Sequence, residues 1–185
     1  MPPTSPAPPT SPTPPAPLLF LDVDGPLIPF GERGSAPHPT YSPAPPASVS
    51  PLLARLDPAQ GPRLAALPYE LVWATTWEDD ANAWVAPRLG LPPLPVVRWP
   101  DDGPGPGGGV HWKTPVLVVW AAGRPFAWAD DEIGVTDRAW VADHHPGPAL
   151  LHRVDPGQGL TRADFAALAD WPGGRAGSVR SCGAG

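Results

Sequence analysis

The chain is poor in the residues that build several common kinds of site. Its 185 residues include one cysteine, Cys182, which excludes an internal disulfide and a cysteine-rich metal site. Lysine and arginine total 12 against 18 acidic residues, and the net charge of −6 argues against a broad nucleic-acid-binding face. No apolar run approaches the ~20 residues that a membrane span needs. The sequence therefore predicts no membrane partner.

Proline is abundant, with 33 residues, and many of them lie near the N-terminus. Residues 1–17 are uncharged and lack the basic start and apolar core of a secretory leader, so we expect a cytoplasmic protein. Their composition predicts a disordered or polyproline-II tail, which could dock a partner that recognises that conformation. We expect one domain over residues 18–172 and a flexible C-terminal tail over residues 173–185.

Apolar strands alternate with helices between the two tails. The expected strands are 18–23, 67–76, 94–99, 124–132 and 148–154, and the expected helices are 51–57, 77–90, 110–123 and 162–171. Residues 132–143 are either helical or irregular, and residues 28–48 are a long loop rich in turn formers. This alternation predicts an α/β fold, a Rossmann-like, mostly parallel sheet with helices on both faces. Ligands bind such sheets at the carboxyl ends of the strands.

Pairs of acids follow two of the predicted strands. Asp22 and Asp24 come after LLFL, and Asp130 and Asp131 come after RPFAWA. Burying a carboxylate without a partner is unfavourable, so each pair either lies in water or faces a ligand. The simpler alternatives are a solvated turn after the first strand and a helix cap after the later one.

Two hydroxyl residues and one lysine complete this set. Thr75 and Thr76 end the second predicted strand, although both could simply cap the helix that follows. Lys113 is the only lysine beside eleven arginines, and it lies near the start of the helix that precedes Asp130. Either the single lysine reflects drift in a sequence of strongly biased composition, or this position requires a lysine.

The order of these motifs resembles the haloacid dehalogenase-like (HAD) hydrolase superfamily. The motifs are DVDG, an apolar strand ending in threonine, a lone lysine and an apolar strand ending in DD, and the resemblance covers about residues 18–170. The chain is most similar to compact members without a large cap domain, because the 28–48 stretch is too irregular for a folded cap. The resemblance implies a Mg²⁺-dependent phosphatase that acts through an aspartyl-phosphate intermediate.

The same resemblance implies catalytic roles. Asp22 would be the nucleophile, and Asp24 would be the general acid and base. Lys113 would neutralise the nucleophile and the incoming phosphate. Thr75, nearer the apolar run, is favoured over Thr76 as the residue that donates a hydrogen bond to a phosphoryl oxygen.

Mg²⁺ is the expected cofactor, since magnesium prefers oxygen ligands. The expected ligands are the Asp22 carboxylate, the Asp24 backbone carbonyl and one of Asp130 and Asp131, with the choice between these two left open. Trp77 and Trp112 flank the motifs and could line a substrate pocket.

The expected substrate is a phosphorylated small molecule or macromolecular end, and nucleic acid is expected only as a substrate. Two other functions remain open. One is a catalytically silent module that binds phosphate or a partner. The other is a dehalogenase, although Asp24 argues against it because a halide leaving group needs no proton. The 28–48 loop could also act as a lid.

Overall fold

The computed structural model describes residues 15–31, 37–100, 107–171 and 173. The tails expected over 1–17 and 173–185 therefore lie almost wholly outside the described residues, as does Cys182.

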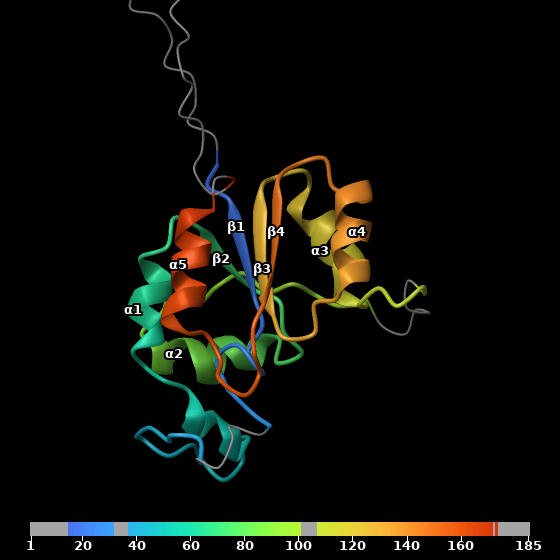
Figure 1. The fold of residues 1–185 in the computed structure, drawn as a ribbon. Coiled ribbons are helices and arrows are strands. Elements are labelled where there is room, and N and C mark those ends of the chain that lie inside the picture. Colours follow the sequence, from blue (N-terminus) through green and yellow to red (C-terminus); the bar gives the residue numbers. More distant parts are fainter. Residues whose placement is uncertain (1–14, 32–36, 101–106, 172, 174–185) are drawn as a thin grey trace, which may run out of the picture.

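A four-stranded parallel sheet forms the centre of the fold (Figure 1). Its strands are β1 (Leu18–Leu21), β2 (Glu70–Trp73), β3 (Phe126–Asp130) and β4 (Ala149–Arg153), in the order β2-β1-β3-β4. All three pairings are parallel, which confirms the predicted α/β class. The strand order reverses between the adjacent strands β1 and β3, and ligands bind α/β sheets at such a reversal.

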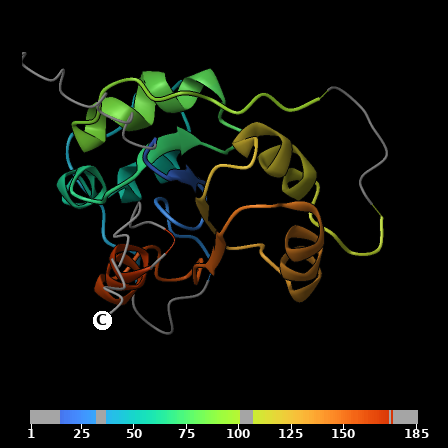
Figure 2. The ribbon, with the colours of Figure 1, turned by 90° about the horizontal axis from the view of Figure 1, so that it is seen from above.

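Helices cover both faces of the sheet, as predicted (Figures 1 and 2). On one face lie α1 (Gln60–Ala65), α2 (Ala86–Leu89) and α5 (Arg162–Asp170), which pack with Leu19 and Leu21. On the other lie α3 (Lys113–Ala121) and α4 (Val135–His144), which pack with Leu18 and Phe20. Because both faces are covered, β1 is apolar throughout instead of alternating.

Several helix ends follow the sequence pattern. Ser50 caps the 3₁₀ helix η1 (Pro51–Arg55) by accepting a hydrogen bond from the Leu52 N–H. Thr161 and Asp164 form the capping box at the start of α5. Gly90 ends α2 in the left-handed conformation. A short π-helical segment, η2 (Ala81–Val85), precedes α2 in the helix predicted over 77–90.

The strand predicted over 94–99 is wrong. This segment contributes one isolated bridge between Val96 and Trp73, with hydrogen bonds from the Trp73 N–H to the Pro95 carbonyl and from the Val97 N–H to the Trp73 carbonyl. The physical reason is proline, which cannot donate to a strand ladder and occurs at 92, 93 and 95. Residues 135–144, in the segment left open between helix and irregular structure, form helix α4.

Helix α1 was not predicted from the sequence. A glycine and a proline lie within its six residues, and both usually mark loops. Gly61 is needed there because a Cβ at this position would lie 1.7 Å from the Leu89 carbonyl oxygen of α2. Glycine therefore allows the two helices to touch through their backbones.

Among the described residues, none of the helices is both long and apolar enough to cross a membrane.

Candidate active site

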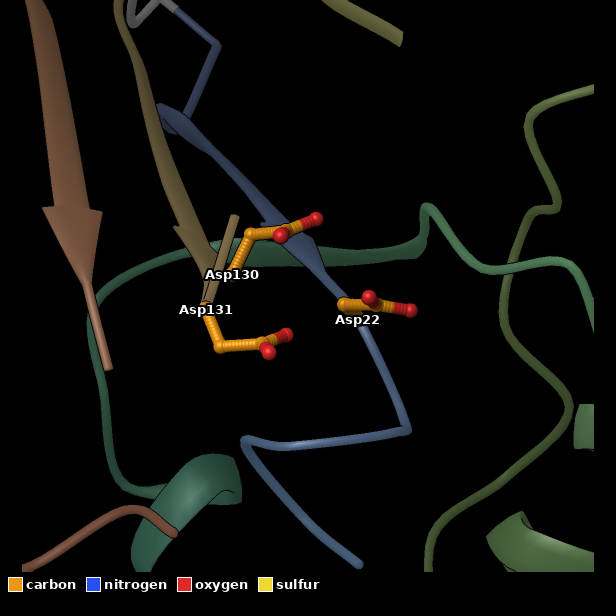
Figure 3. A group of neighbouring side chains, drawn as sticks. All are labelled: Asp22, Asp130 and Asp131. Carbon is orange, nitrogen blue, oxygen red and sulfur yellow. The ribbon is translucent and has the colours of Figure 1, made fainter. Parts of the chain in front are cut away.

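Three carboxylates meet where β1 and β3 end (Figure 3). Asp22 follows the last residue of β1, Asp130 is the last residue of β3, and Asp131 comes next. The side chains of Asp130 and Asp131 extend toward Asp22, and one oxygen from each of the three lies within 4.8 Å of the others. The parallel pairing of β1 with β3 brings these distant parts of the sequence together.

Lys113 lies between two of these acids. It is the first residue of α3, its side chain is 3% exposed, and its Nζ donates to Asp22 Oδ2 and to Asp130 Oδ2, each at 2.8 Å. The structure thus brings together the only lysine and the two predicted acid motifs.

A buried aspartate holds the start of α3 in place. Asp137 of α4 accepts hydrogen bonds from the Thr114 hydroxyl at 2.6 Å and from the His111 N–H at 2.8 Å. It also accepts from the Gly134 N–H at 2.8 Å, so the two helix starts share one anchor. Asp137 therefore positions the backbone that carries Lys113.

Burial and charge perturb the ionisable groups of the cluster. Burial raises the pKa of the Asp22 carboxyl to about 7, although Lys113 acts in the opposite direction. Burial and the neighbouring Asp130 raise the pKa of Asp131. Burial acts to lower the pKa of the Lys113 ammonium, but Asp22 and Asp130 outweigh it and raise this pKa above its usual value. With every group ionised, three carboxylates face one ammonium, which leaves an excess of negative charge.

The two acids at the end of β3 have different surroundings. Asp130 is fully buried, and its Oδ1 accepts from the Glu132 N–H. Its Oδ2 accepts from Lys113 Nζ and from the Trp128 indole N–H. Asp131 is only half-buried and lines a pocket. Asp130 is therefore occupied with internal partners, and Asp131 is the acid presented to the pocket.

Asp24 lines the same pocket, outside the three-carboxylate cluster. Its Oδ2 accepts a hydrogen bond from the Trp77 indole N–H at 2.9 Å, which fixes the carboxyl orientation. The chain turns directly after Asp24, and this turn requires Gly25, whose φ is +86°. A Cβ on Gly25 would lie 2.6 Å from Asp131 Oδ1, so this glycine also makes room for the acid.

The two threonines after β2 lie in different places. Thr75 is completely buried, and its hydroxyl accepts from the Trp77 N–H at 3.3 Å. Thr76 is exposed and is the threonine among the described residues that line the pocket. The choice of Thr75 as the phosphate contact stays a prediction. Because Thr76 lines the pocket, its position favours Thr76 for this contact.

The pocket over these groups has a volume of about 270 Å³. Its described lining consists of Asp22, Asp24, Phe30, Thr76, Trp112, Lys113, Asp131 and Glu132. The sequence reading missed Phe30 and Glu132. Glu132 pairs with His111 Nε2 at 3.0 Å. It directly follows Asp130 and Asp131 in the sequence, and this position was the one sign that it could belong to the site. Phe30 lies in a turn-rich stretch with no periodicity that could single it out.

The fold and this site together define an α/β protein with a lysine-bridged acidic pocket at the reversal of strand order. No family model, no curated protein and no solved structure matches the chain with significance.

Proposed function

We propose that this protein is a Mg²⁺-dependent phosphomonoester hydrolase of the HAD-like type. The observation that carries the proposal is the Lys113 ammonium, which lies 2.8 Å from Asp22 and from Asp130 at the edge of the pocket. Hydrolysis of phosphate esters depends mainly on positioning and on neutralising charge. A buried ammonium beside a carboxylate nucleophile meets both needs.

Asp22 is the nucleophile in this proposal. One of its oxygens attacks phosphorus, the bond from phosphorus to the leaving oxygen breaks, and an aspartyl-phosphate forms. In the second half-reaction a water oxygen attacks phosphorus, the bond to Asp22 breaks, and inorganic phosphate leaves. The position of Asp22 directly after β1, an interior strand of the sheet, gives it a rigid support.

Asp24 transfers the protons in both steps. Its carboxylic acid gives a proton to the leaving alkoxide, and the resulting carboxylate then takes a proton from the attacking water. The hydrogen bond from Trp77 holds one carboxyl oxygen, which leaves the other available for this exchange. Such help is typically worth ~10²–10⁴ in rate.

The donor set fits a divalent cation. Carboxylate oxygens are the ligands that Mg²⁺ prefers, and the three acids carry more negative charge than Lys113 balances. We assign direct binding to Asp22 and Asp131, with the Asp24 carbonyl as a third ligand, and we assign Asp130 to holding Lys113. When bound, the cation would favour the ionised form of Asp22 and offset charge on the phosphoryl oxygens.

Lys113 and Thr76 bind the phosphoryl group. The ammonium neutralises one phosphoryl oxygen, and the Thr76 hydroxyl donates to another. The segment between β1 and β2 supports assignment to a compact, capless type, because its described residues form only η1 and α1. A site without a cap leaves room for either a small molecule or a macromolecular end.

The direct test is hydrolysis of 4-nitrophenyl phosphate with Mg²⁺ and with EDTA. We expect turnover with Mg²⁺, none with EDTA, and a loss of at least ~10³-fold in Asp22→Asn. Asp143→Asn, an exposed acid on α4, is the matched control and should keep the wild-type rate. Equal rates for wild type and Asp22→Asn would refute the mechanism.

Two further measurements separate the alternatives. A protein that binds Mg²⁺ and phosphate without turnover is the silent module. Chloride release from a 2-haloacid, lost in Asp22→Asn, would indicate a dehalogenase.

A further inference from the structure

Two exposed aromatic side chains lie at the acidic pocket. Among the described residues, four large hydrophobic side chains are exposed, and these are Phe30, Trp112, Val119 and Val135. Phe30 is 37% exposed and Trp112 is 39% exposed, and both line the pocket that contains Asp22. Exposed aromatic rings beside polar catalytic groups are typical of ligand sites, since their burial is completed by the ligand.

Neighbouring rings hold Trp112 in one orientation. Trp99 packs against it edge-on, with ring centroids 4.8 Å apart and an interplanar angle of 77°. His111 packs against it at 5.4 Å with a tilt of 32°. Trp99 is itself fixed by a hydrogen bond from its indole N–H to the Thr75 carbonyl oxygen. The exposed part of Trp112 is therefore a rigid surface that a ligand meets without ordering it.

Phe30 is also held through its backbone. Its N–H donates to the Pro156 carbonyl at 2.8 Å, in the segment that follows β4. The pocket thus has an aromatic residue from the chain after β1 and another from the start of α3.

The charge of the lining restricts the rest of the ligand. Asp24, Asp131 and Glu132 are acidic, and Lys113, the cation of the described lining, is already paired with two carboxylates. A bound Mg²⁺ would be engaged by the phosphoryl group, so a second anionic group on the substrate would lie close to acidic side chains without a free cation to pair with. The volume of about 270 Å³ lies below the ~300–1,000 Å³ of sites for drug-sized ligands.

We propose that the substrate is a phosphate monoester whose leaving alcohol carries one aromatic ring and no further negative charge, with the ring in contact with Trp112 and Phe30. This inference rests on the proposed function. It disfavours nucleic-acid ends, whose backbone phosphates would face Glu132 and its acidic neighbours.

The test compares 2-phenylethyl phosphate with 2-cyclohexylethyl phosphate, which have similar leaving oxygens and similar size. We expect kcat/KM to be about threefold to tenfold higher for the phenyl ester, the range typical of a ring–ring contact. Trp112→Leu and Phe30→Leu should each reduce this ratio toward one, because leucine keeps apolar bulk without a π face. A carboxylate added to the phenyl ring should lower kcat/KM about tenfold, because it would be repelled by the acids of the lining.

Val119→Ala is the control, since Val119 is exposed on α3 and does not line the pocket. It should leave the phenyl preference unchanged. Circular dichroism identifies any variant that fails to fold, and the two pocket variants give independent routes to the answer. Turnover of both esters without preference, or a preference that survives in both folded pocket variants, would overturn the inference and leave the proposed function standing.

Binding of phosphonates separates the inference from catalysis. Calorimetry in Mg²⁺ would compare 3-phenylpropylphosphonate with 3-cyclohexylpropylphosphonate, neither of which has a P–O bond to an alcohol. We expect the phenyl compound to bind more tightly and Trp112→Leu to remove the difference. Equal binding would overturn the aromatic preference. Phenyl-selective binding without hydrolysis of any ester would overturn the proposed function, and with it the assignment of a substrate, and would leave only the aromatic binding preference.

Discussion

Gly25 and Gly31 adopt the left-handed conformation, with φ of +86° and +78°, but only one of them touches the site. A Cβ on Gly25 would meet Asp131 Oδ1, whereas a Cβ on Gly31 would meet nothing within 4 Å. Alanine at either position strains the backbone by ~1–2 kcal/mol. We expect Gly25→Ala also to displace Asp131 and to raise the Mg²⁺ concentration for half-maximal hydrolysis by about tenfold or more. The check is a Mg²⁺ titration of activity.

Gly31→Ala is the matched control for backbone strain, and it should lose stability without a change in Mg²⁺ dependence. An equal change in Mg²⁺ dependence for both variants would show that the contact with Asp131 has no role in metal binding.

The two threonines after β2 make a second pair of matched variants. Thr76→Val removes a hydroxyl at the pocket, so we expect kcat/KM to fall about tenfold or more, the size of a lost hydrogen bond to a charged group. Thr75→Val removes the acceptor of the Trp77 N–H, so we expect it to lower the free energy of unfolding by about 1 kcal/mol. Steady-state kinetics and urea unfolding measure the two effects. The reverse pattern would identify Thr75 as the phosphate contact.

The sequence could indicate that Asp22, Lys113 and Asp130 converge, because parallel strands place their carboxyl ends at one edge. It could not indicate which of two adjacent threonines or aspartates faces the pocket. The side chains of adjacent residues at a strand end point in different directions, and the local turn determines which of them points into the pocket. That decision depends on contacts such as the Trp77 N–H on Thr75, which no pattern of residue types predicts.

At the scale of elements, α5 is attached to the sheet by Asp164, the carboxylate of its capping box. Asp164 accepts from the Thr161 N–H and hydroxyl at 2.7 and 2.6 Å, and it pairs with His152 Nε2 of β4 at 2.8 Å. Partial burial acts to raise the pKa of Asp164, but the hydrogen bonds from Thr161 and then His152 outweigh it and hold this pKa below its usual value.

A lowered pKa in the folded state fixes the sign of a pH effect. Asp164 contributes stability above the ordinary aspartate pKa of ~3.9, and this contribution disappears as the pH falls through its lower folded value. We expect Asp164→Asn to lower the free energy of unfolding by about 1 kcal/mol at pH 7 and by less at pH 3. Urea unfolding across this range provides the measurement, with Asp143→Asn as control. A difference that grows toward acid would contradict the assignment.

Elements could be predicted from the sequence where local interactions define them. The predictions failed where contacts with other parts of the fold define the element. The capping box of α5 is local, because Thr161 and Asp164 lie three residues apart in the pattern typical of a helix start. Helix α1 depends on Gly61 lying against the Leu89 carbonyl, a contact with another helix. The 94–99 segment has strand-like residues at 96 and 97, but its prolines limit the pairing to a single bridge.

At the scale of the molecule, a bound cation should stabilise the fold as well as the site, because the folded chain assembles ligands from two separate strands. At Mg²⁺ of about 100 times its dissociation constant, we expect ~2.7 kcal/mol of added stability, a rise in Tm of roughly 5–10 °C. Differential scanning calorimetry with Mg²⁺ and with EDTA measures it.

Asp131→Asn should abolish most of this rise, and Asp143→Asn should keep it. A rise of the same size in Asp131→Asn would place the stabilising cation at another site on the protein.

The strand order has a consequence for biosynthesis. Of the four strands, β1 is translated first, yet it pairs with β2 from residue 70 and with β3 from residue 126. A ribosome must therefore add more than a hundred further residues before the apolar LLFL segment finds its second neighbour. During that interval the nascent polypeptide exposes an apolar, aggregation-prone segment of the kind that chaperones bind. Truncated chains that stop before β3 should accordingly aggregate.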